Sequence, residues 1–160
     1  MPKIDVAATP ALAGTAYPPP FHLNCYGRQR QKLGDAGGLN QFGINLMRLP
    51  DGQWSSQRHW HTSEDEFVWV LEGEVVLVED EVETILRAGD CAAFPAGVPN
   101  GHHLQNRSGR DALLLEVGGR QPEADVCTYP GIDLHLPLGA EGYETLDGKS
   151  YGPFIQRTEP

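Results

Sequence analysis

Cysteine is scarce in this chain of 160 residues, and its three cysteines, Cys25, Cys91 and Cys127, form no C-x-x-C pair. An odd number of widely spaced cysteines argues against a disulfide framework and fits a reducing compartment. We expect no signal peptide either, because residues 1–20 include Asp5 and Pro10 and have no continuous apolar segment. The sequence therefore predicts a cytoplasmic protein whose cysteines are small packing residues.

Positive charge is also in short supply. Lysine and arginine total 12 against 22 aspartates and glutamates, which gives a net charge of −10. Such a surface repels phosphate backbones and anionic lipid. No basic cluster or helix-turn-helix segment stands out, and no stretch approaches the ~20 apolar residues of a membrane span. We expect neither a nucleic-acid partner nor a membrane partner.

Long helical patterns are absent as well. The chain has 19 glycines and 13 prolines, and both residue types disfavour long helices. From Leu39 onward, short alternating runs recur about every eight to twelve residues, which is typical of an all-β sandwich or small barrel. We predict a single domain over 1–160. It consists of an extended N-terminal arm (1–38), a barrel core (39–119) and a C-terminal arm (120–160) that lies over the barrel or over a partner subunit.

The stretch RHWHTSEDEFVWVLEG, residues 58–73, concentrates candidate metal ligands. On an extended strand His59 and His61 point to the same side and Trp60 points away. Glu66 begins the next antiparallel strand, where it can lie across from the histidines. A carboxylate on an apolar strand face is costly unless it is paired or binds a cation. Two imidazoles and a carboxylate suit a first-row divalent metal, although the same residues could instead form hydrogen bonds in a polar barrel interior.

A second histidine-containing stretch, GDCAAFPAGVPNGHHLQN, covers residues 89–106. His102 and Asn106 share one face of the predicted strand, and His103 lies on the other face. One of the two adjacent histidines must therefore point into a barrel at this position.

Together these stretches resemble the two motifs of the cupin superfamily. The first motif, G(x)5HxH(x)3–4E(x)6G, is matched from its first histidine onward by His59, His61, Glu66 and Gly73. Its leading glycine, Gly52, lies one residue farther upstream than the pattern requires.

The second motif, G(x)5PxG(x)2H(x)3N, is matched in part. Its first three fixed positions are Gly89, Pro95 and Gly97. Asn100 stands where the histidine is expected, and inserting two residues restores the match through His102 and Asn106. The two motifs cover residues 52–106. The sequence around them is similar to that of small bacterial stand-alone cupins, some of which are labelled sugar-phosphate isomerases.

The resemblance implies a double-stranded β-helix, a jelly-roll-like barrel that holds one divalent transition metal: iron, manganese, zinc, nickel or cobalt. The implied ligands are His59, His61, Glu66 and His102. We favour His102 over His103 because its spacing to Asn106 follows the motif, and His103 remains the alternative. The resemblance also implies a homodimer.

These observations lead us to expect a metalloenzyme, of the isomerase or dioxygenase type, acting on a small oxygenated substrate that is sugar-like or a carboxylate. No general base outside the ligand set stands out, so the sequence identifies no catalytic residue. A non-catalytic metal-dependent module that binds or senses a small molecule remains an alternative. So does a structural cupin, because function belongs to the site and not to the fold.

Overall fold

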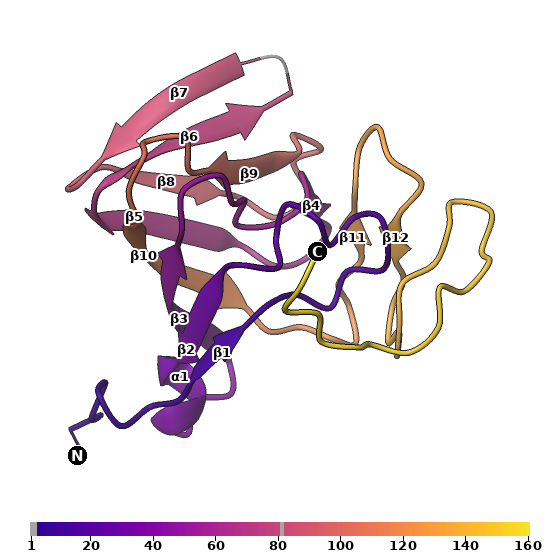
Figure 1. Cartoon of the computed structure of the whole chain (residues 1–160). Coiled ribbons are helices and arrows are strands. Elements are labelled where there is room, and N and C mark those ends of the chain that lie inside the picture. The colour runs from indigo at the N-terminus through magenta and orange to yellow at the C-terminus, as the bar shows by residue number, and fades with distance from the viewer. Residues whose placement is uncertain (1–2, 81) are drawn as a thin grey trace.

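Strands make up almost all of the regular structure in the computed structural model, which describes residues 3–80 and 82–160 (Figure 1). The one helix in these ranges is a single turn, α1 (Leu33–Ala36). Within the described chain, no helix has the length and apolar character that crossing a membrane requires. The strands are β1 (Ala11–Ala13), β2 (Gln29–Lys32), β3 (Phe42–Leu49), β4 (Trp60–His61), β5 (Glu66–Glu72), β6 (Glu74–Glu79), β7 (Val82–Arg87), β8 (Cys91–Phe94), β9 (His102–Gln105), β10 (Ala112–Gly119), β11 (Cys127–Thr128) and β12 (His135–Leu136).

Two antiparallel sheets form the barrel. The larger sheet has the strand order β1-β2-β3-β10-β5-β8, and the smaller sheet has the order β7-β6-β9. A third small sheet, β12-β11-β4, lies at one end of the barrel (Figure 1). The prediction of an all-β, jelly-roll-like barrel is confirmed.

The apolar core fills one part of the barrel interior. The larger sheet contributes Met47, Val70 and Leu114, which are all 0 % exposed. The smaller sheet contributes Val75 and Leu104, which are 0 % and 4 % exposed. Burying a side chain of this size stabilises the fold by about 1.5–3 kcal/mol. Because alternate residues of a strand face opposite sides, the same strands also present polar side chains to the remaining part of the interior.

The N-terminal segment, for which we expected an extended arm, joins the larger sheet. Its strand β2 pairs with β3 and β1 pairs with β2. The sheet therefore begins well before residue 39, and β2 becomes part of the wall that encloses the interior.

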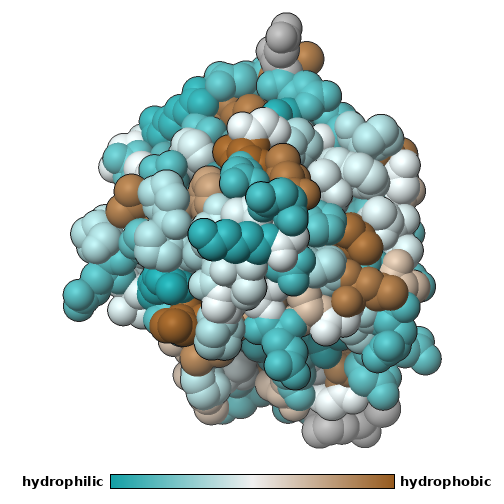
Figure 2. Space-filling view, turned by 90° about the vertical axis from the view of Figure 1, so that its right-hand side faces the viewer, coloured by the Kyte–Doolittle hydropathy of each residue, from teal (hydrophilic) through white to brown (hydrophobic). Residues whose placement is uncertain are grey.

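The C-terminal segment builds a second apolar core against the N-terminal segment. Tyr17 and Cys25 pack there with Cys127, Tyr129 and Leu134, and none of the five is more than 4 % exposed. The backbone N–H of Arg157 donates to the Thr15 carbonyl at 2.7 Å and closes the chain ends together. The outer surface on this side of the molecule is mainly hydrophilic, with small separate hydrophobic spots (Figure 2).

Candidate metal centre

Three histidines are held at the end of the barrel by short strands and backbone pairing. His61 belongs to β4 and His102 begins β9. His59 lies just before β4 and pairs with His102 through two backbone hydrogen bonds of 3.1 and 2.9 Å. As the alternation predicts, the side chains of His59 and His61 approach each other, with ring centroids 5.1 Å apart.

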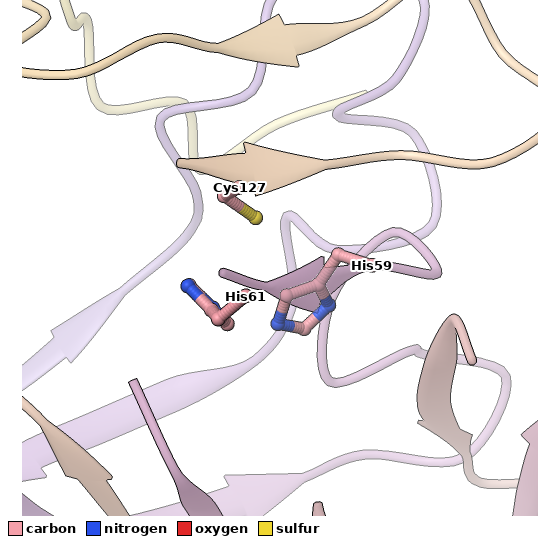
Figure 3. A group of neighbouring side chains, drawn as sticks. All are labelled: His59, His61 and Cys127. Atoms are coloured by element: carbon pink, nitrogen blue, oxygen red, sulfur yellow. The ribbon is translucent and has the colours of Figure 1, made fainter. Parts of the chain in front are cut away.

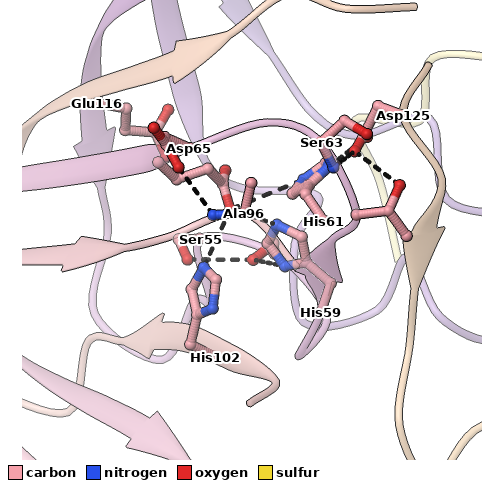
Figure 4. Close-up of polar contacts among 12 residues, drawn as sticks. Ser55, His59, His61, Ser63, Asp65, Ala96, His102, Glu116 and Asp125 are labelled. Atoms are coloured by element: carbon pink, nitrogen blue, oxygen red, sulfur yellow. Dashed lines mark hydrogen bonds and ion pairs between the residues drawn. The ribbon is translucent and has the colours of Figure 1, made fainter. Parts of the chain in front are cut away.

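Glu66, the first residue of β5, brings its carboxylate to these histidines. Its Oε2 lies 3.0 Å from His102 Nε2, 3.4 Å from His59 Nε2 and 3.7 Å from His61 Nε2. Figure 4 shows the rings of His59, His61 and His102 gathered at this point. The structure therefore brings together all four residues that the sequence singled out. Three imidazole nitrogens and one carboxylate oxygen suit a first-row divalent metal, and the ligand atoms of His59, Glu66 and His102 lie within 4.8 Å of one another.

The other ring nitrogen of each histidine faces an acceptor. Nδ1 of His59 lies 2.9 Å from the Gln57 carbonyl, and Nδ1 of His61 lies 2.6 Å from the Asp125 carboxylate. Nδ1 of His102 has a longer contact of 3.4 Å with the Asn100 carbonyl. These acceptors favour the proton on Nδ1 and leave the Nε2 lone pairs free. The tautomers that a metal requires are thus built into the surroundings of the three rings.

The electrostatics of the group favour a cation beside Glu66. Burial disfavours the charge of Glu66, but attraction to His59 and the hydrogen bond with His102 outweigh it and hold the pKa of Glu66 well below its usual value. Burial also works against protonation of His59, and the charge of Glu66 more than offsets it, so the pKa of His59 is raised. A divalent cation between the three rings and Glu66 would be favoured by the same negative charge.

His103 does not face this group. Its Nδ1 lies 3.0 Å from the Ser56 carbonyl, its Nε2 lies 2.9 Å from Gln105 Nε2, and its ring packs edge-on against Trp54. Of the two adjacent histidines, it is His102 that lies beside Glu66.

The environment of His103 predicts a pH dependence of stability. Burial lowers the pKa of His103 to about 4, whereas the unfolded chain binds this proton near pH 6.5. The contribution of His103 to stability is therefore fully present above about pH 6.5 and is lost as the pH falls towards about 4. Urea unfolding at several pH values should show this loss in the metal-free protein, and a His103→Gln variant should lose less stability over the same range. Equal pH dependence of the two proteins would contradict the assignment.

Two residues near the histidines, Asp125 and Cys127, belong to no sequence pattern that predicts their place at this site. Asp125 binds His61 and also accepts a hydrogen bond of 2.8 Å from the backbone N–H of Ser63. Cys127 is the register partner of His61 in the β11–β4 pair, and its sulfur lies within 4.8 Å of a ring nitrogen of His59 and of His61 (Figure 3). Burial raises the pKa of the Cys127 thiol, so the thiol stays neutral. Both residues come from the segment after 119, where we predicted only a covering arm.

The turn residues of the first motif secure the position of Glu66. Asp65 points away from the histidines and accepts a hydrogen bond of 2.8 Å from the backbone N–H of Ala96, which ties the two motif stretches together. Glu64 stays in the turn and accepts a hydrogen bond from the backbone N–H of Gln121. The orientation of Asp65, opposite to that of Glu66, is the one that alternation along an extended chain gives to neighbouring residues.

A cavity of about 430 Å³ opens beside the histidines and Glu66. Its other walls come from β2, β3 and β10, and the polar side chains lining it include Arg30, Asn45 and Glu116. Such a volume accommodates a small molecule. The candidate metal position is therefore reachable by a ligand.

The comparisons with known proteins identify the family. Residues 45–118 match the Cupin domain family model. A solved structure described as a sugar phosphate isomerase from a cupin superfamily, from Silicibacter pomeroyi, is 43 % identical. The match covers 93 % of this chain and 96 % of that one, with a TM-score of 0.86. This chain belongs to the cupin superfamily, as the motifs predicted.

Two further solved structures extend the likeness. A putative sugar phosphate isomerase from Acidithiobacillus ferrooxidans is 30 % identical, with 76 % of this chain and 77 % of that chain covered and a TM-score of 0.68. A predicted oxalate decarboxylase from Thermotoga maritima is 19 % identical, with 75 % and 100 % covered and a TM-score of 0.59, which is a likeness of fold alone. No curated protein matches the chain.

Proposed function

We propose that this cupin is a metal-dependent enzyme acting on a small oxygenated substrate, sugar-like or a carboxylate, by isomerisation or oxidation. The observation that carries the proposal is the convergence of three imidazole Nε2 atoms on Glu66 Oε2 at the wall of an accessible cavity. The 43 % identity to a protein described as a sugar phosphate isomerase supports the isomerase form.

In this proposal His59, His61, Glu66 and His102 hold one divalent transition metal. When bound, such an ion polarises a carbonyl or hydroxyl oxygen of a substrate, and a redox-active one also supports oxidation. The residues of the chain do the rest. Asp125 and the Gln57 carbonyl fix the tautomers of His61 and His59.

The cavity also contains a candidate proton-transfer group. Glu116 faces the interior from β10 and is held by Arg30 through contacts of 2.7 and 3.1 Å. A carboxylate that is fixed by a guanidinium and exposed to a ligand cavity can accept a proton from a substrate hydroxyl or C–H group. Sequence reasoning missed it because β10 reads as an ordinary barrel strand.

The experiment begins with metal content. Protein purified without a histidine tag is loaded separately with manganese, iron, cobalt, nickel and zinc. Each form is then incubated in deuterated water with aldose and ketose phosphates and with small hydroxy acids. NMR detects isomers and exchanged C–H positions, and an oxygen electrode detects oxidation. Turnover that disappears with His59→Ala supports the proposal. Binding of metal and ligand without turnover would instead favour a binding module, and binding of metal without any ligand would favour a structural cupin in which the metal stabilises only the fold. Absence of metal in every form would favour histidines that only form hydrogen bonds inside the barrel.

We also propose a two-fold homodimer through the outer face of the larger sheet. Trp69 is 45 % exposed there, next to an apolar groove of about 450 Å³ that includes Phe42, Phe67 and Val117. A two-fold contact brings the same surface of both copies together, so Trp69 of one copy can face the groove of the other.

The dimer proposal predicts that Trp69→Glu produces a monomer, because a charge on an apolar interface is costly to bury. Ile85→Glu is the matched control, since Ile85 is 48 % exposed on β7 of the smaller sheet. Light scattering after gel filtration measures the mass. A wild-type monomer, or equal effects of the two variants, would contradict the proposed surface.

The cytoplasmic location remains a prediction.

A further inference from the structure

Strand β2 presents basic side chains to the cavity. Arg30 and Lys32 are two residues apart and pair in register with Met47 and Asn45 of β3. Met47 is a core residue and Asn45 lines the cavity, so this face of β2 points inward. Arg28 continues the same alternation and also lines the cavity. A chain with only 12 lysines and arginines and a net charge of −10 thus places three of those 12 side by side at one cavity wall.

Positive charge at this wall exceeds the negative charge that compensates it. Arg28 is 7 % exposed, and its guanidinium donates only to neutral acceptors: the Gly14 carbonyl at 3.2 Å, the Thr15 hydroxyl at 3.0 Å and the Ser55 carbonyl. Arg30 takes both oxygens of Glu116. The buried guanidinium of Arg28 therefore has no carboxylate of its own, although buried charges are normally paired, and the half-buried Arg30 occupies the carboxylate of Glu116.

Lys32 adds a third positive charge at the outer end of the same row. In residues 3–80 and 82–160 its ammonium group takes part in none of the hydrogen bonds or ion pairs. Because it is exposed at the cavity and lacks a partner there, it can turn towards an incoming ligand at little structural cost.

The row of basic side chains formed by Arg28, Arg30 and Lys32 lies close to the candidate metal centre. The Ser55 carbonyl accepts hydrogen bonds from both Arg28 and Arg30, and the next residue, Ser56, places its hydroxyl 3.2 Å from His59 Nδ1. In the β10–β5 pair Gly118 lies opposite Glu66. Glu116, two residues before Gly118 on the same face, is therefore the diagonal neighbour of Glu66, at about 7–8 Å. A ligand of only a few non-hydrogen atoms spans the space between the two sites.

We propose that Arg28, Arg30 and Lys32 form an anion-binding subsite that receives the carboxylate or phosphate end of the substrate. This inference rests on the proposed function, since it takes the cavity to be the substrate site. It narrows the substrate to a molecule with an anionic group at one end and a hydroxyl or carbonyl oxygen at the other. A neutral sugar lacks the group that would complete the charge balance of β2.

The test uses full-length protein stripped of metal, so that an anion cannot bind through a metal ion. Inorganic phosphate and acetate are titrated at constant ionic strength, with glycerol as the neutral probe, and melting temperature and calorimetry report binding. The variants are Lys32→Gln and the charge-neutral pair Arg30→Gln with Glu116→Gln. Arg48→Gln is the matched control, because Arg48 lies on the outer face of β3 and pairs with Asp111.

We expect at least one anion to bind wild type and the Arg48→Gln variant equally, and glycerol not to bind. Binding should weaken about tenfold in Lys32→Gln, the effect of losing one charge-assisted hydrogen bond, and further in the double variant. Tighter phosphate binding assigns a phosphate ester, and tighter acetate binding a carboxylate. Absence of binding by both anions, or equal binding in all variants, overturns the subsite. The metal content of the same preparations, measured before stripping, tests the proposed metal-dependent function separately. A failure of the anion-binding subsite can therefore be distinguished from a failure of that function.

Discussion

Replacing His102 by alanine should reduce bound metal from about one equivalent per chain to below about a tenth, because a structured site that loses one of four ligands no longer holds the ion against exchange. His102 Nε2 is the imidazole nitrogen closest to Glu66 Oε2, at 3.0 Å, and its side chain is only 7 % exposed. Metal analysis after dialysis against a weak chelator measures the effect.

The neighbouring residue provides the control for this experiment. A His103→Ala variant should keep its metal, because both ring nitrogens of His103 contact other groups, Ser56 and Gln105. The adjacent positions have the same residue type and similar burial, so only their orientation distinguishes them. Retention of metal by His102→Ala, with loss in His103→Ala, would reverse the proposed ligand assignment.

Asp125→Asn should weaken metal affinity about 10- to 100-fold, the usual effect of losing a carboxylate that orients a histidine ligand. An asparagine oxygen can still accept the His61 Nδ1 proton but lacks the charge that makes His61 a stronger donor to the metal. Competition with a chromophoric chelator gives the affinity for zinc or manganese.

The control for this substitution comes from the same C-terminal segment. Asp133→Asn changes a carboxylate that caps the backbone N–H of Leu146, away from the histidines, and should leave the affinity unchanged. If Asp125→Asn binds metal as tightly as the wild type, the contact between Asp125 and His61 serves only to dock the C-terminal segment.

Strand alternation and motif spacing were sufficient to predict that His59, His61, Glu66 and His102 lie close together. His59 and His61 share a face because they are two apart on an extended chain, and Glu66 follows after a turn of the length that the motif allows. Such information is local in the sequence. The choice of His102 over His103 depended on the spacing to Asn106, and the structure places His102 on the side of Glu66.

Long-range contacts were beyond the reach of the sequence. Asp125 meets His61 across 64 residues of chain, and their approach depends on the register of β11 against β4, which packing of the second apolar core secures. β2 was also missed, because the stretch QRQK is polar on both faces and has no apolar alternation to indicate a strand. Both omissions affected the cavity more than the barrel.

The joining of the two chain ends by the second apolar core limits how the candidate metal centre can be transplanted. The region that the family model recognises, residues 45–118, contains the three histidines and Glu66. It includes neither Asp125 nor strand β2 with its basic side chains. A fragment or graft with those bounds would keep the histidines and Glu66. It would lose Asp125, which contacts His61, and the residues of the proposed anion-binding subsite. Domain shuffling or engineering that preserves the chemistry must therefore move residues 11–157 as one unit, from β1 to the Thr15–Arg157 pairing.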